Sequence, residues 1–69
     1  MIGETEATVA EARPFGLHGV TYHDVTLAYP DGSTETARLG PEAVPERLAQ
    51  GERVMVLRAA GVVVSIRRP

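Results

Sequence analysis

The residues best suited to metal chemistry are the two histidines and the aspartate beside the second of them, His18, His23 and Asp24. Imidazole nitrogens and carboxylate oxygens are common ligands of zinc and other transition metals. His23 and Asp24 are consecutive in a segment that we predict to be a β-strand, so their side chains should point to opposite faces of it. We therefore expect one loop histidine and one strand histidine, and we predict no metal ion and no other cofactor.

The chain lacks the side chains on which most covalent catalysis depends. It has no cysteine, and all seven of its basic residues are arginines, which excludes thiolate nucleophiles and lysine Schiff bases. The only serines are Ser33 and Ser65, and neither stands in the Gly-x-Ser-x-Gly sequence that exposes a nucleophile. No set of nucleophile, base and oxyanion donors is recognisable, so we predict that the protein is not an enzyme.

Aromatic and arginine side chains offer a different chemistry, the stacking of bases and the binding of phosphates. The net charge of −2 disfavours nucleic acid as a partner, because binding to it depends on neutralising phosphates. Single-stranded nucleic-acid binding is nevertheless kept as the alternative function. The residues of such a ligand loop would be Arg13, Phe15, Tyr22, Arg38 and Arg58. In the competing interpretation, Phe15 and Tyr29 fill a core that is otherwise short of large side chains.

Several short strands must position these residues, and the first is the least clear. Residues 4–13 alternate weakly, with Ala7, Val9 and Glu11 on one face, although their alanine and glutamate content would also suit a helix. Pro14 should end the segment, because it fixes φ and has no N–H to donate to a neighbouring strand. The Phe-Gly-Leu-His-Gly sequence that follows is then expected to be a loop.

A hairpin follows. Residues 20–29 alternate clearly, with Val25 and Leu27 on one face, and their β-branched and aromatic content favours a strand. The Pro-Asp-Gly-Ser sequence at 30–33 supplies a fixed φ, a side-chain cap and a positive φ, as a tight connection requires. Residues 34–39 are expected to return as the partner strand.

The next segment predicts the only helix. Residues 42–50 suit a helix of one to two turns, with Val44 and Leu48 four residues apart on one face. Pro45 interrupts this pattern, so the helix alternatively begins there as its first helical residue, with Gly51 as its left-handed terminator.

Two further strands, residues 53–58 and 62–67, complete the order and are joined by a tight turn at Ala59-Ala60-Gly61. Three strands, a helix and two strands are the element order of the OB-fold, a five-stranded, partly open Greek-key barrel. An SH3-like barrel is the alternative and would replace the helix with a short 3₁₀ turn, usually one strand later. We predict a single all-β domain, a small β-barrel spanning residues 1–69.

Several pieces of this sequence resemble the transport-associated OB domains, small modules appended to transport ATPases. The likeness spans about residues 7–66 and rests on Arg13-Pro14-Phe15-Gly16, on Val25-Thr26-Leu27 leading to Asp31-Gly32, and on Gly51-Glu52-Arg53-Val54. It implies an OB-fold. The sequence also resembles small stand-alone barrels of unknown function that are common in GC-rich bacteria.

The related molbindins have a similar length and form oligomers that hold oxyanions at subunit contacts through backbone amides, serine and lysine. This chain has no lysine and lacks their Ala-Arg-Asn opening, so no residue is assigned to anion binding. An oligomeric, molybdate-like small-anion binder is the second alternative function.

The last two predicted strands are apolar on both faces, which is unusual for the outside of a lone barrel. If the apolar residues at 54, 56, 62, 64 and 66 point inward, the side chains facing outward are Met55, Leu57 and Val63. A domain of 69 residues without disulfides also has little core to stabilise it. We therefore predict an interaction surface at Met55, Leu57 and Val63 that joins the chain to a protein partner or to a second copy, most simply as a homodimer.

Charge is segregated along the chain. Three glutamates, at positions 4, 6 and 11, precede any basic residue, and the last sixteen residues before the C-terminal proline contain only basic charges, at 53, 58, 67 and 68. If the first strand neighbours the fourth, cross-strand Glu–Arg pairs should help to fix their register. No apolar run approaches the roughly 20 residues of a membrane span, and no signal-peptide pattern is present. We expect a cytoplasmic, non-enzymatic interaction module that self-associates.

Overall fold

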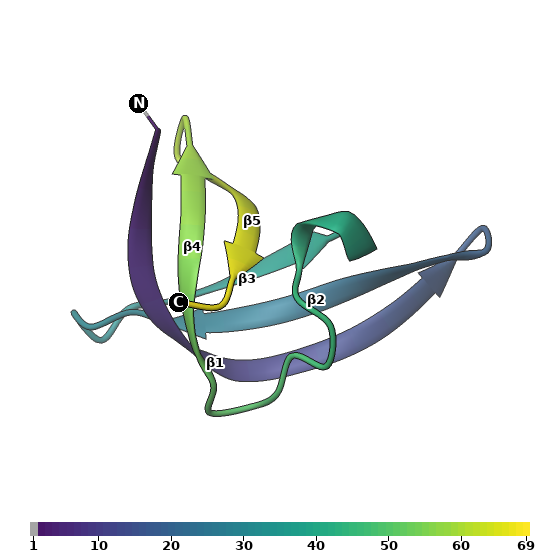
Figure 1. The fold of residues 1–69 in the computed structure, drawn as a ribbon, viewed down its shortest axis with the longest axis horizontal. Helices are drawn as coiled ribbons and strands as arrows, with labels where there is room; N and C mark the ends of the chain where they lie inside the picture. Colours follow the sequence, from purple (N-terminus) through teal and green to yellow (C-terminus); the bar gives the residue numbers. More distant parts are fainter. Residues whose placement is uncertain (1) are drawn as a thin grey trace.

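Five antiparallel β-strands form one sheet in the computed structural model, which describes residues 2–69 (Figure 1). The strands are β1 (Ile2–Leu17), β2 (Val20–Ala28), β3 (Thr34–Leu39), β4 (Arg53–Ala59) and β5 (Val62–Arg67), and a single 3₁₀ turn, η1 (Pro41–Ala43), lies between β3 and β4. Their order in the sheet is β3-β2-β1-β4-β5, so four of them follow the 4-1-2-3 order of a Greek key. The all-β prediction is confirmed. The sheet is not closed, because β3 and β5 are its two edges.

Strand β1 is longer than predicted, and the expectation that Pro14 ends it is wrong. The strand continues to Leu17, and Pro14 lies opposite His23 of β2. The two-residue turn makes Leu17 and Val20 a hydrogen-bonded pair, and hydrogen-bonded and non-bonded pairs alternate from there. Pro14 falls on a non-bonded pair, so its missing N–H would point to the open edge of β1, where a proline costs no ladder bond.

The predicted loop after Pro14 is correspondingly reduced to two residues. His18 and Gly19 both have positive φ, 51° and 76°, which is the combination of a type I′ turn. Ala60 and Gly61, with φ of 53° and 77°, form the same kind of turn between β4 and β5. Because type I′ turns match the twist of the flanking strands, both connections support tight hairpins.

Two irregularities in the register change which residues face the core. Val9 lies opposite Leu27 but Glu11 lies opposite Thr26, so Ala10 is an extra residue in β1. An extra residue reverses the alternation beyond it, and Glu11 is therefore exposed, contrary to the prediction that it shares a face with Val9.

The second irregularity corrects the orientation predicted for Val63. Arg58 lies opposite Val63 and Leu57 lies opposite Ser65, which makes Val64 the extra residue in β5. Val63 is consequently buried, while Val64 on the bulge is 45% exposed. Val63 belongs to the core and not to an outer surface.

The helix predicted at residues 42–50 is wrong, since the described part of the chain contains no α-helix. Val44 precedes Pro45 and is extended, with φ −132° and ψ 149°, because the proline ring disfavours helical angles in the residue before it. Arg47 then has a φ of 58°, which also ends any helical path. Val44 and Leu48 nevertheless pack against the core, as a covering loop.

The core lies on the concave side of the curved sheet and consists of nine buried residues, Ala7, Val9, Val25, Leu27, Leu39, Val54, Val56, Val63 and Ile66. Val25 and Leu27 share a face as predicted, Val54 and Val56 point inward as expected, and each of these four is 0% exposed. The expectation that Val62 and Val64 point inward is wrong, since they are 61% and 45% exposed. No aromatic side chain belongs to this set. Tyr29 packs only at its margin. The hydrophobic contribution to stability is therefore modest.

The turn between β4 and β5 offers a first prediction. Ala60 holds a left-handed φ, which is costly for alanine and much less so for asparagine, and Asn-Gly is the preferred type I′ pair. Ala60→Asn should stabilise the fold by about 0.5–1 kcal/mol and raise Tm by a few degrees in thermal unfolding. Ala60→Thr, with a β-branched side chain at the same φ, should lower it, and equal Tm values for the two variants would contradict this reading.

Candidate functional site

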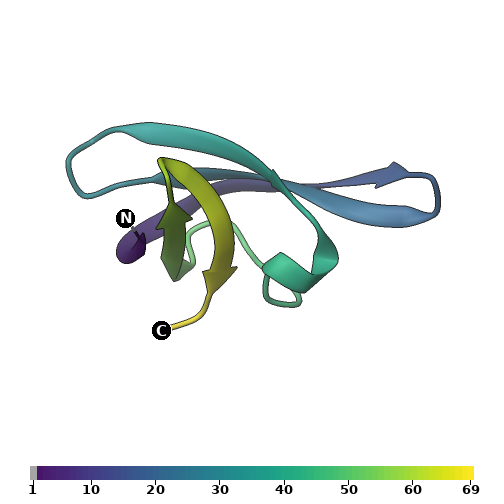
Figure 2. The same ribbon diagram turned by 90° about the horizontal axis from the view of Figure 1, so that it is seen from above.

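The most distinctive feature of the molecule is a two-stranded ribbon that projects from the body (Figures 1 and 2). Strand β4 pairs with β1 only as far as Thr8, and β3 pairs with β2 only from His23 onward. Beyond these points β1 and β2 pair with each other alone. We call residues 11–26 the arm, whose inner rows still have β3 beside β2, and residues 15–22 its tip. At the tip, the ribbon has no third strand beside it.

One face of the arm gathers the side chains that do not point to the core. Ala12 and Val25 lie opposite each other and face the core. Because side chains alternate along a strand, the residue pairs on either side of this one, and every second pair beyond them, face away from the core. From the tip inward the first three of these pairs are Leu17 with Val20, Phe15 with Tyr22, and Arg13 with Asp24, and Arg38 of β3 continues the third row. We call these seven residues the arm face. Leu17 and Val20 are 45% and 40% exposed, and Phe15 and Tyr22 are half-buried.

The charged row of the arm face is internally paired. Arg38 donates two hydrogen bonds to Asp24, from Nε to Oδ1 at 2.8 Å and from Nη2 to Oδ2 at 3.1 Å. These bonds, and to a lesser degree the nearby charges of Arg38 and Arg13, lower the pKa of Asp24, while Asp24 raises the pKa of Arg38. The Arg38 guanidinium also lies 4.1 Å from the centre of the Phe15 ring, a cation–π contact that holds the ring against the strand.

Four of the five residues predicted for a ligand loop thus come together. Arg13, Phe15, Tyr22 and Arg38 share the arm face, although on a strand pair and not on a loop. Arg58 does not join them, because it lies on the core side of β4. Leu17 and Val20 were not predicted. The alternation of side chains through and beyond Pro14 is the pattern that would have pointed to them.

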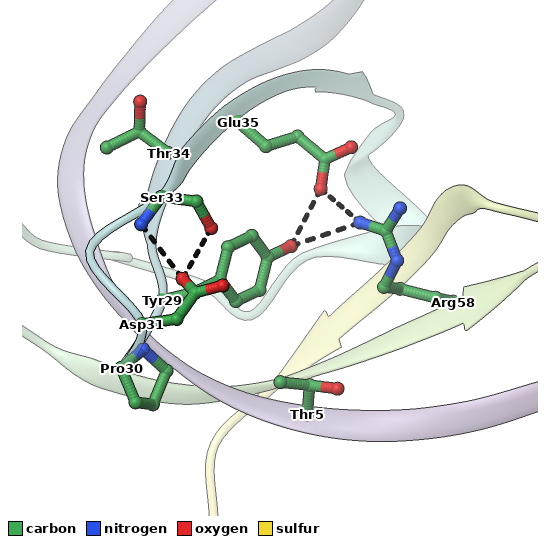
Figure 3. A pocket seen from close by; sticks show the side chains of 8 residues that line it. All are labelled: Thr5, Tyr29, Pro30, Asp31, Ser33, Thr34, Glu35 and Arg58. Atoms are coloured by element: carbon green, nitrogen blue, oxygen red, sulfur yellow. Dashed lines mark hydrogen bonds and ion pairs between the residues drawn. The ribbon is translucent and has the colours of Figure 1, made fainter.

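Arg58 belongs to a second polar site, a three-residue cluster that we call the latch (Figure 3). Tyr29 donates a 2.8 Å hydrogen bond from Oη to Oε1 of Glu35, and Arg58 binds the same carboxylate and lies 3.3 Å from the Tyr29 hydroxyl. A further 2.8 Å bond joins Nη2 of Arg58 to the carbonyl of Gly61. The latch therefore connects the β2–β3 hairpin to the β4–β5 turn across the open part of the sheet.

The latch forms one wall of an open hollow of about 620 Å³, lined also by Thr5, Asp31 and Ser33 among others. Burial, and then the hydrogen bond to Glu35, raises the pKa of Tyr29. The hydrogen bond from Tyr29, and then those from Arg58 with its charge, lower the pKa of Glu35. Each charged group of the latch already has an opposite charge beside it. The arrangement therefore joins β3 to β4 across the open side of the curved sheet through side chains and not through backbone hydrogen bonds.

The latch predicts an acid-dependent loss of stability. The folded-state pKa of Glu35 lies below its ordinary value of 4.5, so the unfolded chain binds its proton more tightly. The stabilisation is therefore complete above that ordinary value and is lost as the pH falls through the folded-state pKa. Glu35→Gln should flatten the decline in unfolding free energy between about pH 5 and pH 3, measured by denaturant titration. A decline as steep as in the original chain would contradict the assignment.

The predicted interaction surface on the last hairpin is more covered than expected. Glu4 shares a row with Leu57, and Arg67 shares a row with Met55. Two hydrogen bonds between Arg67 and Glu4, of 2.7 and 2.9 Å, therefore cross β4 between the two apolar side chains. Met55 and Leu57 are half-buried, and the apolar stem of Arg67 crosses between them.

The expected pairing of the first and fourth strands is confirmed. Strands β1 and β4 are neighbours, and an ion pair between Glu6 and Arg53 links them on the same outer face. Arg68 pairs with Glu52 near the end of the chain. The Glu6–Arg53 pair is largely exposed, with side chains 45% and 71% exposed, so it contributes to register more than to stability.

Within residues 2–69, no group of three or more histidine, cysteine, aspartate or glutamate side chains lies close enough to hold a metal ion. His18 occupies the β1–β2 turn, and His23 lies on the opposite face of β2 from Asp24. Asp24 is engaged by Arg38. The same part of the chain contains no helix of the length and apolar character that a membrane crossing requires.

Comparison with known proteins adds no relative. No family model, no curated protein and no solved structure matches this chain. The likeness to transport-associated OB domains therefore stays a prediction, and the arm and the latch must be interpreted from their own geometry.

Proposed function

We propose that this chain is a non-enzymatic interaction module that self-associates. The observation that carries the proposal is the projecting arm. A two-stranded ribbon on its own is at best marginally stable in water. This one extends an apolar tip, with Leu17 and Val20 exposed on one face beside the half-buried Phe15 and Tyr22. Burying that tip against another protein surface would stabilise both the ribbon and the small domain behind it.

The composition of the core supports association. Nine buried residues, five of them valines, and the absence of cysteine leave the chain without a disulfide or a large hydrophobic centre. Oligomerisation is one of the usual remedies for a domain of this size. The surface expected from the sequence, Met55 and Leu57, is half-covered, so the arm is the better candidate for the contact.

We further infer that the fold is OB-like, left open between β3 and β5. Three consecutive antiparallel strands and a fourth strand that returns beside the first give the Greek-key arrangement typical of that class. The 3₁₀ turn η1, which replaces the predicted helix, is the feature expected of an SH3-like barrel, although it lies between the third and fourth strands, one strand earlier than is usual there. The SH3-like barrel remains the alternative. Strands β3 and β5 are not paired in the sheet of the described residues, and detection of backbone hydrogen bonds between them by NMR would close the sheet and support an OB-like barrel.

The test of self-association is the dependence of molar mass on concentration. Sedimentation equilibrium or light scattering over micromolar to millimolar chain concentrations should show a mass that rises from the 7.4 kDa of one chain towards that of an oligomer. A mass that stays at one chain across this range would overturn the proposal.

A second candidate, binding of single-stranded nucleic acid, is favoured by one specific observation. Two aromatic side chains, Phe15 and Tyr22, lie beside Arg13 and Arg38 on one face, as in surfaces that stack bases and contact phosphates. Asp24 offsets part of this positive charge. Fluorescence anisotropy with labelled oligonucleotides at low salt would detect binding. A nucleic-acid function would require that it weaken with added salt and in Phe15→Ala.

A further inference from the structure

We propose that two copies of this chain pack their arm faces against each other about a two-fold axis that runs along the arm. This inference rests on the proposed self-association and names the surface and the geometry that produce it. The partner is a second copy because the arm face is complementary to itself in this one arrangement, as its rows of side chains show.

The two-fold rotation places each row of the arm face over the same row of the partner, with β1 of one copy over β2 of the other. A rotation by half a turn about an axis along the arm, midway between β1 and β2, places β1 of one copy over the partner's β2 at the same distance from the tip. Leu17 then faces the partner's Val20, and Phe15 faces the partner's Tyr22. Apolar side chains meet apolar side chains, and aromatic rings meet aromatic rings.

The charged row is complementary under the same operation. Arg13 comes to lie opposite the partner's Asp24, and Asp24 opposite the partner's Arg13, so that each contact between copies joins opposite charges. The reverse orientation, with the arms antiparallel, would place Leu17 and Val20 over a charged row. It would thereby bury charges against apolar groups, which is costly. The arrangement of rows selects the parallel one.

The rest of the molecule leaves this face accessible. The core, the loop with η1, and strands β4 and β5 lie on the other side of the ribbon, as Figure 2 shows. Contact through the open edge of β1 is disfavoured, because Pro14 lacks the N–H that a further strand would need there. The arm therefore associates by its face. Its small size places the interface at the low end of the range for specific complexes, below roughly 1,200 Å².

The decisive experiment reverses one charge at a time. Arg13→Asp places two acidic residues opposite each other across the axis, and Asp24→Arg places two basic residues there. Each variant alone should dimerise at least about tenfold more weakly than the original chain in sedimentation equilibrium. An equimolar mixture of the two should restore dimers, because every contact between unlike chains is then an acid–base pair.

Two controls keep the result interpretable. Arg47→Asp makes the same charge change on an exposed loop and should leave the dimer intact. Since Asp24→Arg also removes the partner of Arg38, its fold is checked by circular dichroism, and Val20→Asp provides a second route to the same interface. Val20→Asp should abolish the dimer, whereas Val62→Asp, at a valine 61% exposed on β5, should not.

The outcomes distinguish a failure of the proposed self-association from a failure of the arm interface alone. An original chain that is monomeric at all concentrations overturns the proposed function itself, and the arm dimer with it. An original chain that dimerises, while both charge reversals and Val20→Asp dimerise equally well, overturns only the arm interface. Restoration of dimers in the mixture, but in neither variant alone, supports the two-fold packing of the arms.

Discussion

Replacing Leu27 with alanine should leave the chain largely unfolded at room temperature. Leu27 is the largest fully buried side chain among residues 2–69, and it lies on β2, between β3 and the central strand β1. Truncation of a buried leucine to alanine typically costs 2–5 kcal/mol through lost burial and the cavity that remains. A domain of this size has roughly 3–5 kcal/mol of stability in total. The substitution therefore removes most or all of the free energy that keeps the chain folded.

Circular dichroism and denaturant titration would measure this loss, and the chain offers a matched pair of valines as a control. Val56 and Val62 lie in the same β4–β5 hairpin and are 0% and 61% exposed. Val56→Ala should destabilise clearly, and Val62→Ala should have an effect near the measurement error. If Leu27→Ala unfolds no more readily than Val62→Ala, the core is misplaced.

The strands could be predicted from sequence because their alternation is local. The bounds of β3 and β5 agree with the predicted residues 34–39 and 62–67, and Val25 and Leu27 face the core as the alternation of β2 requires. What failed were single residues that depend on the neighbouring strand. The extra residues Ala10 and Val64 reverse the alternation of side chains in β1 and β5. The sequence of neither strand predicts these bulges.

The predicted effects of Pro14 and Pro45 on their segments are wrong for a related physical reason. Pro14 ends a strand only if its missing N–H falls on a paired edge, and which edge it faces depends on the register with β2. Pro45 acted more strongly than expected, since it holds Val44 extended and removes the predicted helix altogether. The same residue type was thus permissive in one place and disruptive in another, according to its surroundings.

The arm face could be predicted in part from the sequence, whereas the latch could not. Arg13, Phe15, Tyr22 and Arg38 were recognised as a possible ligand set from their chemistry, and strand pairing explains why they meet. The latch could not be anticipated, because Arg58 is twenty-three residues from Glu35 and meets it only through the curvature of the whole sheet. Contacts of that kind follow from the tertiary fold and not from local pattern.

The latch itself is built to hold that curvature. The β2–β3 hairpin carries Tyr29 and Glu35, and β4 carries Arg58, yet no backbone hydrogen bonds join β3 to β4 or β5 in the sheet order. The side chains of Glu35 and Arg58 are 32% and 30% exposed, and Arg58 is the least exposed of the ion-paired arginines, so its charge is better shielded from water than theirs. Losing one partner leaves the other partly buried and unpaired.

Arg58→Met should therefore lower Tm by several degrees, while Arg53→Met should not change it measurably. Both arginines lie on β4 and both pair with a glutamate, but the Arg53 side chain is 71% exposed and its partner Glu6 is 45% exposed. Methionine keeps much of the apolar volume and removes the charge, so the difference between the variants isolates the shielded pair. Amide hydrogen exchange should be faster in β3 and β5 of Arg58→Met, because these are the two edges that the latch holds in place. Equal Tm values and unchanged exchange would mean that the sheet keeps its curvature through core packing alone, without the latch.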